Sequence, residues 1–299
     1  MLQEKTNLIE IVGLLSEVAI EERQKDPENI NSKYLTGTVT IKTEIEIDGQ
    51  MTEVDIPINV FANKITTKGN SNPVYESLMN VKNNMTSIAA CGNKEEATCV
   101  RVYQEKGSLR ENSFYGSQGN LVQGLRVTAG FFNQVPRTKY ENTARFETIV
   151  FILDIIEETD REGIETGRLL IKSAVPGYNG VINNINYVVQ NKRAIEHINS
   201  FWKKGDTVKV FGKFNFTTKI DTVTEEVGFG ESVEKKVSRS QKELLITAGS
   251  PTALDDEDSF EANEIIAGLE KRKAELEAKK NEANKKPAQK KLDAAALGF

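Results

Sequence analysis

The sequence predicts a mainly β protein: two tandem five-stranded barrels, an N-terminal amphipathic helix, and a partly helical or disordered C-terminal tail. Three observations lead to this prediction. Apolar and polar residues alternate through much of 33–249, which is typical of half-buried strands. The pattern GxFN follows a strand-like run twice, at 130–133 and at 212–215. After residue 250 the sequence becomes acidic and rich in turn formers, which favours a solvated tail.

The first segment, 1–30, has apolar residues at helical spacing, for example Ile11, Leu15 and Val18. Asp26-Pro27 then ends the pattern, because proline disfavours helix continuation. We therefore predict an amphipathic helix whose apolar stripe packs on its own chain or on a partner. If that partner is a second copy of the chain, the protein is a homo-oligomer.

The first predicted barrel spans 31–140. TGTVTIKTEIEI and TEVDIPINVFA alternate cleanly around Asp48-Gly49, a pair that favours a tight hairpin turn. Two more strand-like runs, ATCVRVYQ and LVQGLRVTAGFF, flank the Gly-, Ser- and Asn-rich stretch KGSLRENSFYGSQGN, which we interpret as a hairpin loop.

The second predicted barrel spans 141–249. ETIVFILDIIEET and RLLIKSAVPGY form a strand pair, residues 192–202 a short helix, and TVKVFGKFNFTTKI and KELLITAG the last strands. Both segments thus show a hairpin, a connecting helix or loop and a glycine-marked strand. Small Greek-key barrels have this order, with glycine where a strand bends sharply to close the barrel. The tail 250–299 runs from acidic to Lys-rich.

Composition disfavours an enzyme. The single histidine, His197, has no partner motif for zinc binding or nucleophilic catalysis, and the sequence has no phosphate-binding glycine loop. We expect no cofactor and no metal, and we interpret Cys91 and Cys99 as reduced thiols. No run approaches the ~18 apolar residues of a membrane span, so we expect a cytoplasmic protein without membrane contact.

The formal net charge of −5 argues against a nucleic-acid partner until it is divided along the chain. Residues 1–28 hold 7 acidic and 3 basic residues, and 249–299 hold 11 acidic and 9 basic residues. In contrast, 101–145 hold 7 basic and 3 acidic residues, and 161–220 hold 10 basic and 4 acidic residues. The acidity therefore belongs to the two ends.

Aromatic residues are concentrated in the same region, with 15 of 21 between 101 and 220. Single-stranded nucleic acid needs this mixture, since Lys and Arg neutralise phosphates while aromatic faces stack on unpaired bases. The candidate DNA-binding residues are Arg101, Tyr103, Arg110, Phe114, Tyr115, Arg126, Arg137, Lys139, Tyr140, Arg168, Lys172, Tyr178, Trp202, Lys203, Lys204, Lys209, Phe211 and Lys213.

Each aromatic residue has an alternative structural role. In VKVFGKFNF, strand alternation places Lys209, Phe211 and Lys213 on an exposed face and Phe214 in the core. Trp202 follows a helical segment and is either a core residue or a stacking platform. Phe114 and Tyr115 lie in the predicted loop, where the fold needs no aromatic residue, and they are the preferred stacking candidates.

The stretch 146–216 resembles the oligonucleotide-binding (OB) folds of single-stranded-DNA-binding proteins. FETIVFILDI, RLLIKSAVPGY and WKKGDTVKVFGKFN carry the resemblance. It implies OB-like barrels and a single-stranded DNA partner. The acidic run Asp255–Asp258 and the end Leu297-Gly298-Phe299 resemble the tails by which bacterial relatives recruit replication and repair proteins. The length of the chain, the tandem arrangement of two OB-like segments and the overall residue composition resemble those of a bacteriophage-encoded protein.

These observations leave three hypotheses. The first is a non-catalytic single-stranded-DNA-binding protein of phage DNA replication or recombination, with partner proteins recruited through the tail. The alternative is a phage structural or baseplate protein assembled from OB-like modules. The third is a metal-dependent nuclease with Asp154, Glu157, Glu158 and Asp160 as ligands, although a solvated turn explains these carboxylates better.

Overall fold

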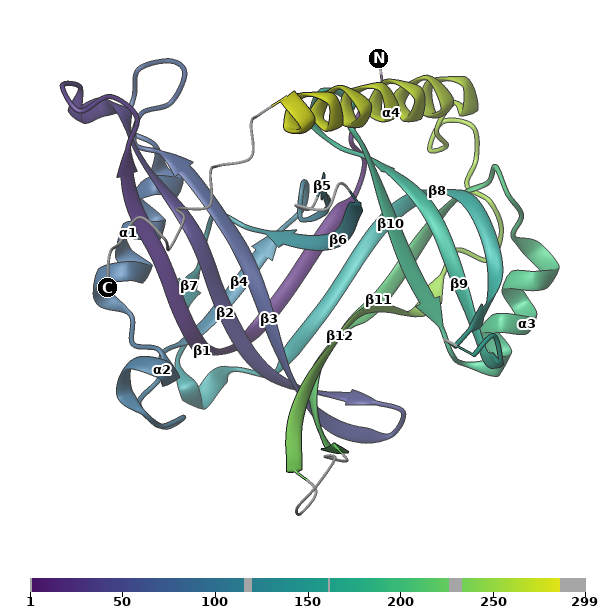
Figure 1. Ribbon diagram of the computed structural model, residues 1–299, viewed down its shortest axis with the longest axis horizontal. Coiled ribbons are helices and arrows are strands. Elements are labelled where there is room, and N and C mark those ends of the chain that lie inside the picture. The colour runs from purple at the N-terminus through teal and green to yellow at the C-terminus, as the bar shows by residue number, and fades with distance from the viewer. Residues whose placement is uncertain (1, 116–119, 161, 226–232, 286–299) are drawn as a thin grey trace, which may run out of the picture.

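A computed structural model describes residues 2–115, 120–160, 162–225 and 233–285. The predicted mainly β class is confirmed, because twelve strands of the described residues join in one hydrogen-bonded sheet that curls through both halves of the chain (Figure 1). The first three strands are β1 (Asn7–Gln24), β2 (Lys33–Ile47) and β3 (Gln50–Asn63). They pair in sequence order as antiparallel neighbours.

The predicted N-terminal helix is wrong, since its residues form the 18-residue strand β1. Both faces of this strand are covered. Ile9, Ile11 and Leu15 enter the main core, whereas Val12 and Leu14 pack in a smaller cluster on the opposite face. A strand buried on both faces has a continuous apolar run without strict alternation, and periodicity alone does not distinguish it from a helix.

The rest of the first half contains α1 (Pro73–Asn84), α2 (Ile88–Cys91), β4 (Cys99–Gln104), β5 (Leu109–Tyr115), β6 (Leu121–Thr128) and β7 (Asn133–Gln134). The predicted hairpin turn is confirmed, because Asp48 and Gly49 both have positive φ between the paired β2 and β3. The predicted loop before β6 is partly wrong. Residues 109–115 are strand β5, and residues 116–119 lie outside the described residues.

The second half contains β8 (Thr143–Thr159), β9 (Glu165–Pro176), β10 (Ile182–Val189), α3 (Lys192–Phe201), β11 (Thr207–Glu225) and β12 (Val233–Gly249). Strand β8 pairs with β9, β9 with β10, β10 in parallel with β12, β12 with β11, and β11 again with β8. These five strands therefore close into a ring. Helix α3 connects β10 to β11.

The first half follows a similar strand order, but among the described residues its strands do not close into a ring. Strands β1, β2 and β3 form a meander, β3 pairs in parallel with β6, and β4 lies on the other edge of β1. Strand β7 pairs with β4. Short 3₁₀ turns complete the chain at Ile30–Ser32, Arg137–Lys139 and Tyr178–Gly180.

Strand β1 joins the two halves. Its first part pairs with β8, and its second part pairs with β2. One large core consequently contains residues of both halves, including Leu15 and Val60 from the first, and Tyr187 and Phe214 from the second.

The tail begins with a docked segment. It is partly helical, as predicted, through α4 (Ala262–Lys285), which lies at the top of Figure 1, above the second half and β5. It differs from the predicted flexible tail, because Phe260 and Ile265 are buried against Ile149, Phe151 and Ile182. Residues 286–299, which include the end Leu297-Gly298-Phe299, lie outside the described residues.

Gly212 lies in β11, in the ring of the second half, at a register shift between Phe211 and Gly212. A Cβ atom here would lie 2.0 Å from the carbonyl oxygen of Leu245 and 2.3 Å from Cζ of Phe146. We expect Gly212→Ala to lower the free energy of unfolding by about 1–3 kcal/mol, as overpacking does. Urea unfolding measures it, with Gly124→Ala as the control, because a Cβ there is 3.9 Å from its nearest neighbour. Equal stability of the two variants would contradict the prediction.

Candidate functional site

A central groove, made of three adjoining cavities, begins within the first half and continues between the two halves. The first, of about 540 Å³, lies between β2–β3 and the β5–β6 hairpin. The second, of about 270 Å³, shares Asn59 and Arg126 with the first. The third, of about 490 Å³, shares Leu125 and Lys242 with the second and extends to β9 and β10. Together the three cavities form one path across the molecule.

The lining of this central groove is basic and rich in amides. Its cations are Arg110, Arg126, Lys172 and Lys242. Its amide side chains are those of Asn59, Gln104, Asn112, Gln123, Asn184 and Asn186. Phe61, 56% exposed, adds an aromatic face at one end. Amide and cationic groups along an open path suit a polyanion with hydrogen-bonding bases.

The β5–β6 hairpin brings two of these cations together. Arg110 and Arg126 are direct cross-strand neighbours, an arrangement that costs free energy because like charges oppose each other. Arg126 donates from Nη2 to Oδ1 of Asn112 at 2.8 Å, and Arg110 donates from Nε to the carbonyl of Gly107 at 2.9 Å. Neither of these two acceptors carries a charge, so neither contact neutralises the guanidinium group.

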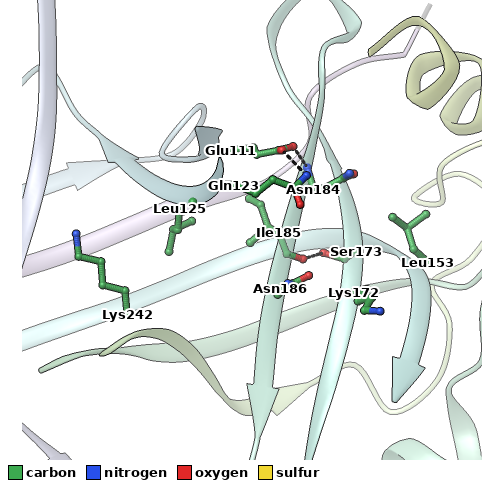
Figure 2. Close-up of a pocket in the computed structure, with 11 residues that line it drawn as sticks. Glu111, Gln123, Leu125, Leu153, Lys172, Ser173, Asn184, Ile185, Asn186 and Lys242 are labelled. Carbon is green, nitrogen blue, oxygen red and sulfur yellow. Dashed lines mark hydrogen bonds between the residues drawn. The ribbon is translucent and has the colours of Figure 1, made fainter. Parts of the chain in front are cut away.

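Glu111 is the one acidic residue among the described residues that line the groove, and it is fully engaged. Figure 2 shows it beside Gln123 and Asn184, whose backbone N–H donates to Oε2 at 2.9 Å. Arg272 of α4 pairs with its other oxygen. The side chain of Glu111 is 6% exposed and that of Arg272 16%. This carboxylate therefore links β5, β10 and α4, and the first-half hairpin is held against the second half.

A second basic surface, which we name the outer face, lies on the exterior of β4, β1, β8 and β11. Cross-strand pairing places Tyr103, Glu10, Arg145 and Lys213 side by side on these four strands. Arg101 also reaches Glu10, donating from Nε at 2.9 Å and from Nη2 at 2.6 Å. The remaining members of the outer face are Glu147, Lys209 and Phe211.

A family model named YorF matches residues 5–282. The chain belongs to the YorF family. No curated protein matches this YorF-family chain. Among solved structures it is similar to a deletion variant of the single-stranded DNA binding protein from Thermus aquaticus, with a TM-score of 0.51 at 11% identity over 87% of this chain and 98% of that one. The wild-type Thermus aquaticus protein gives a TM-score of 0.49 at 10% identity, over 84% of this chain and 95% of that one. The first likeness shows a shared fold.

The structure divides the predicted DNA-binding residues of the YorF-family chain into groups. Arg110, Arg126 and Lys172 line the central groove. Arg101, Tyr103, Lys209, Phe211 and Lys213 lie on the outer face, and Phe214 is fully buried as the alternation predicted. Phe114 and Tyr115 lie on β5 instead of in a loop; Phe114 is 50% exposed, and Lys280 of α4 lies over the Tyr115 ring. Tyr178, 75% exposed, shares a small cavity with Arg110.

Several predicted residues have structural roles instead. Trp202 is buried and donates from Nε1 to the carbonyl of Ser250, so it does not provide an exposed stacking face. Arg168 bridges Glu158 and Glu243, which raises the pKa of its guanidinium group and commits it to the fold.

Two other predicted residues belong to the region around α2. Arg137 donates to the carbonyl of Ala97, and Tyr140 packs in the cluster of Val12 and Leu14. Lys139, Lys203 and Lys204 are exposed in turns outside both surfaces.

Sequence reasoning missed Phe61, Lys242 and Arg145. Phe61 is detectable, because it is an aromatic residue out of phase with the buried positions Val60 and Ala62. Lys242 has no local signal, since it lines the groove only after β12 pairs with β11. Arg145 belongs to the basic segment 101–145, but its place beside Glu10 depends on the long-range pairing of β1 with β8.

The hypothesis of a carboxylate metal site receives no support from the described residues, among which no cluster of three or more metal-binding side chains occurs. Glu158 is paired with Arg168, and Asp160 accepts turn N–H groups from Glu162 and Ile164. Cys91 and Cys99 are free thiols, and burial raises the pKa of Cys99 to about 11. No helix in the described part of the chain is long and apolar enough to cross a membrane.

Glu10 should make stability depend on acid pH. Burial alone would raise its pKa, but hydrogen bonds from Arg145 and Arg101 outweigh burial and hold the pKa below 4.5. The native state thus favours the carboxylate, and this contribution is complete above about pH 4.5 and lost as pH falls through the native-state pKa. We expect the Tm advantage over Glu10→Gln to be largest near pH 7 and to shrink below pH 4.5. A constant advantage from pH 7 to 3 would contradict this expectation.

Proposed function

We propose that this protein is a non-catalytic single-stranded-DNA-binding protein whose central groove holds the strand. The observation that carries the proposal is the opposed pair Arg110 and Arg126 on a path that continues to Lys172 and Lys242. In OB folds, oligonucleotides bind across the second and third strands and the loop between the fourth and fifth. In the first half, β2 and β3 are the second and third strands, and the β5–β6 hairpin follows the fourth strand, β4. The groove lies between β2–β3 and this hairpin.

The groove chemistry accounts for both parts of a nucleotide. Arginine and lysine side chains neutralise phosphates, which gives affinity that falls as salt rises. The exposed ring of Phe61 offers a stacking face at one end, and the amides of Asn59, Asn112 and Asn186 offer donors and acceptors to base edges. An unpaired strand presents base faces and edges that a duplex hides. We therefore expect preference for the single strand.

The acidic run 255–258 does not line the groove among the described residues. It lies in the turn before α4, where Lys5 donates to the carbonyl of Glu257. This placement supports a structural role for 254–285 rather than competition with DNA. The process we propose is DNA replication or recombination of a bacteriophage, in the host cytoplasm, as the sequence resemblance implies.

Fluorescence anisotropy with labelled oligo-dT and a duplex of equal length, each at several salt concentrations, tests the proposal. We expect tighter binding of the single strand and a linear fall of log affinity with log salt concentration. Equal or undetectable binding of both ligands would refute it. If the protein then proved to be a component of purified phage particles, the alternative of an assembly protein would replace it.

A further inference from the structure

The outer face has a cationic row that the central groove does not use. The row crosses four adjacent strands in the order Tyr103, Glu10, Arg145, Lys213. With neighbouring strands about 4.8 Å apart, it is about 14 Å long. Apolar clusters border it: Val12 and Leu14 pack beneath α2 on one side, and Ile149 packs against Phe260 on the other.

The two arginines of the outer face, Arg101 and Arg145, are oriented by the carboxylate of Glu10. The side chain of Glu10 is 9% exposed, and each of its oxygens accepts from Nε and Nη2 of one arginine: Oε1 from Arg101 and Oε2 from Arg145. The Arg101 side chain is nevertheless 50% exposed and that of Arg145 66%. Among the described residues, neither Nη1 group has a hydrogen-bond partner. Both arginines therefore present a free guanidinium edge to solvent.

The charge of the outer face is not cancelled by its own carboxylates. Arg101, Arg145, Lys209 and Lys213 supply four positive charges. Glu10, Glu147 and Glu105, which accepts a hydrogen bond from the Tyr103 hydroxyl at 3.3 Å, supply three negative charges, which leaves +1. Lys213 donates only to a neutral acceptor, the carbonyl of Glu46 at 3.0 Å.

Two aromatic rings lie among these cations. Tyr103 is 42% exposed beneath the guanidinium of Arg101, and Phe211 is partly exposed beneath the ammonium of Lys209. Free guanidinium edges combined with aromatic rings fit phosphates with unpaired bases better than they fit an acidic peptide.

We propose that the outer face is a second binding site for single-stranded DNA, separate from the central groove and engaged by longer strands. The proposal rests on the proposed function, because the ligand is the same polymer. Glu10 acts as a positioning residue that fixes both arginines before DNA binds. Rigid arginines lose less conformational entropy on binding, so their contacts contribute more affinity.

The test uses two lengths of oligo-dT, about 10 and about 40 nucleotides, because one OB fold covers roughly 4–16 nucleotides. The main variant, Glu10→Gln with Arg101→Gln and Arg145→Gln, removes the two cations and the buried carboxylate together. For the longer oligonucleotide, we expect the slope of log affinity against log salt to become shallower by about 1.4, since each phosphate contact to a single strand contributes about 0.7. Affinity for the shorter one should change less than about twofold, because the groove is intact.

A second variant, Tyr103→Ala with Lys213→Ala, leaves the Glu10 triad in place and tests the face if the first variant is unstable. We expect at least about fivefold weaker binding of the longer oligonucleotide alone. The matched control, Lys68→Ala with Lys192→Ala, removes two exposed charges outside both surfaces and should leave both affinities unchanged.

The outcomes separate the two hypotheses. If the unmodified protein binds neither oligonucleotide, the proposed function itself fails. If it binds both but the outer-face variants change neither, or change both equally, the second site is refuted while the groove stands. Binding of an acidic peptide at the outer face without any effect of the variants on DNA would also refute it.

Discussion

Replacing Arg126 and Lys242 with alanine should weaken single-stranded DNA binding by at least about a hundredfold at low salt. A hydrogen bond to a charged partner contributes about 1.5–3 kcal/mol, and about 1.4 kcal/mol corresponds to a factor of ten. The two residues come from different halves of the chain and line the same middle cavity of the central groove. Both contacts should therefore be lost from one continuous strand.

The salt dependence of the affinity shows whether lost phosphate contacts cause the weaker binding. Loss of two phosphate contacts should make the slope of log affinity against log salt shallower by about 1.4. Both side chains are exposed, so the fold should tolerate the change, and circular dichroism with a thermal melt checks this. Lys68→Ala with Lys192→Ala removes the same charge elsewhere. Equal weakening by this control would show that the effect is long-range electrostatics, which would contradict a specific groove.

Arg272→Met should lower the free energy of unfolding by about 3 kcal/mol, because it leaves the carboxylate of Glu111 without its cation. Breaking a buried ion pair by removing one partner typically costs 3–5 kcal/mol. The lower end applies here, since Glu111 keeps the hydrogen bonds from Asn184 and Gln123. Urea unfolding measures the loss.

A matched variant separates the ion pair from the helix contact. Glu111→Gln combined with Arg272→Met removes both charges and should recover most of the lost stability, as replacements of whole buried pairs do. Lys273→Met, at the exposed neighbouring position of α4, should change stability by less than about 0.5 kcal/mol. If the double variant were as unstable as Arg272→Met, the ion pair would not be the cause.

Residues whose roles depend on local alternation were predicted well. The turn at Asp48-Gly49, the exposed side of Lys209, Phe211 and Lys213, and the burial of Phe214 all follow from the period of two. Strand β1 was not predicted, because tertiary packing on both faces removes the alternation of apolar and polar residues that marks a strand.

The candidate site was predicted only in part. Arg110, Arg126 and Lys172 lie in a basic segment and were found by composition. Lys242 and Arg272 reach the site through long-range pairing and docking, which no local pattern reports. Trp202 and Arg168 have the right residue types, but Ser250, the partner of Trp202, and Glu243, one of the two partners of Arg168, are far away in sequence.

The double pairing of β1 has a consequence for how the chain folds. Glu10 meets Arg145, 135 positions later, so the first strand is complete only after the start of the second half has been made. Contacts between such distant residues slow folding, because the long loop between them must close first. During synthesis, the apolar first part of β1 therefore stays unpaired on one edge until β8 has been made. Cutting the chain near residue 141 would leave each half with an unpaired strand edge, and neither half should fold independently.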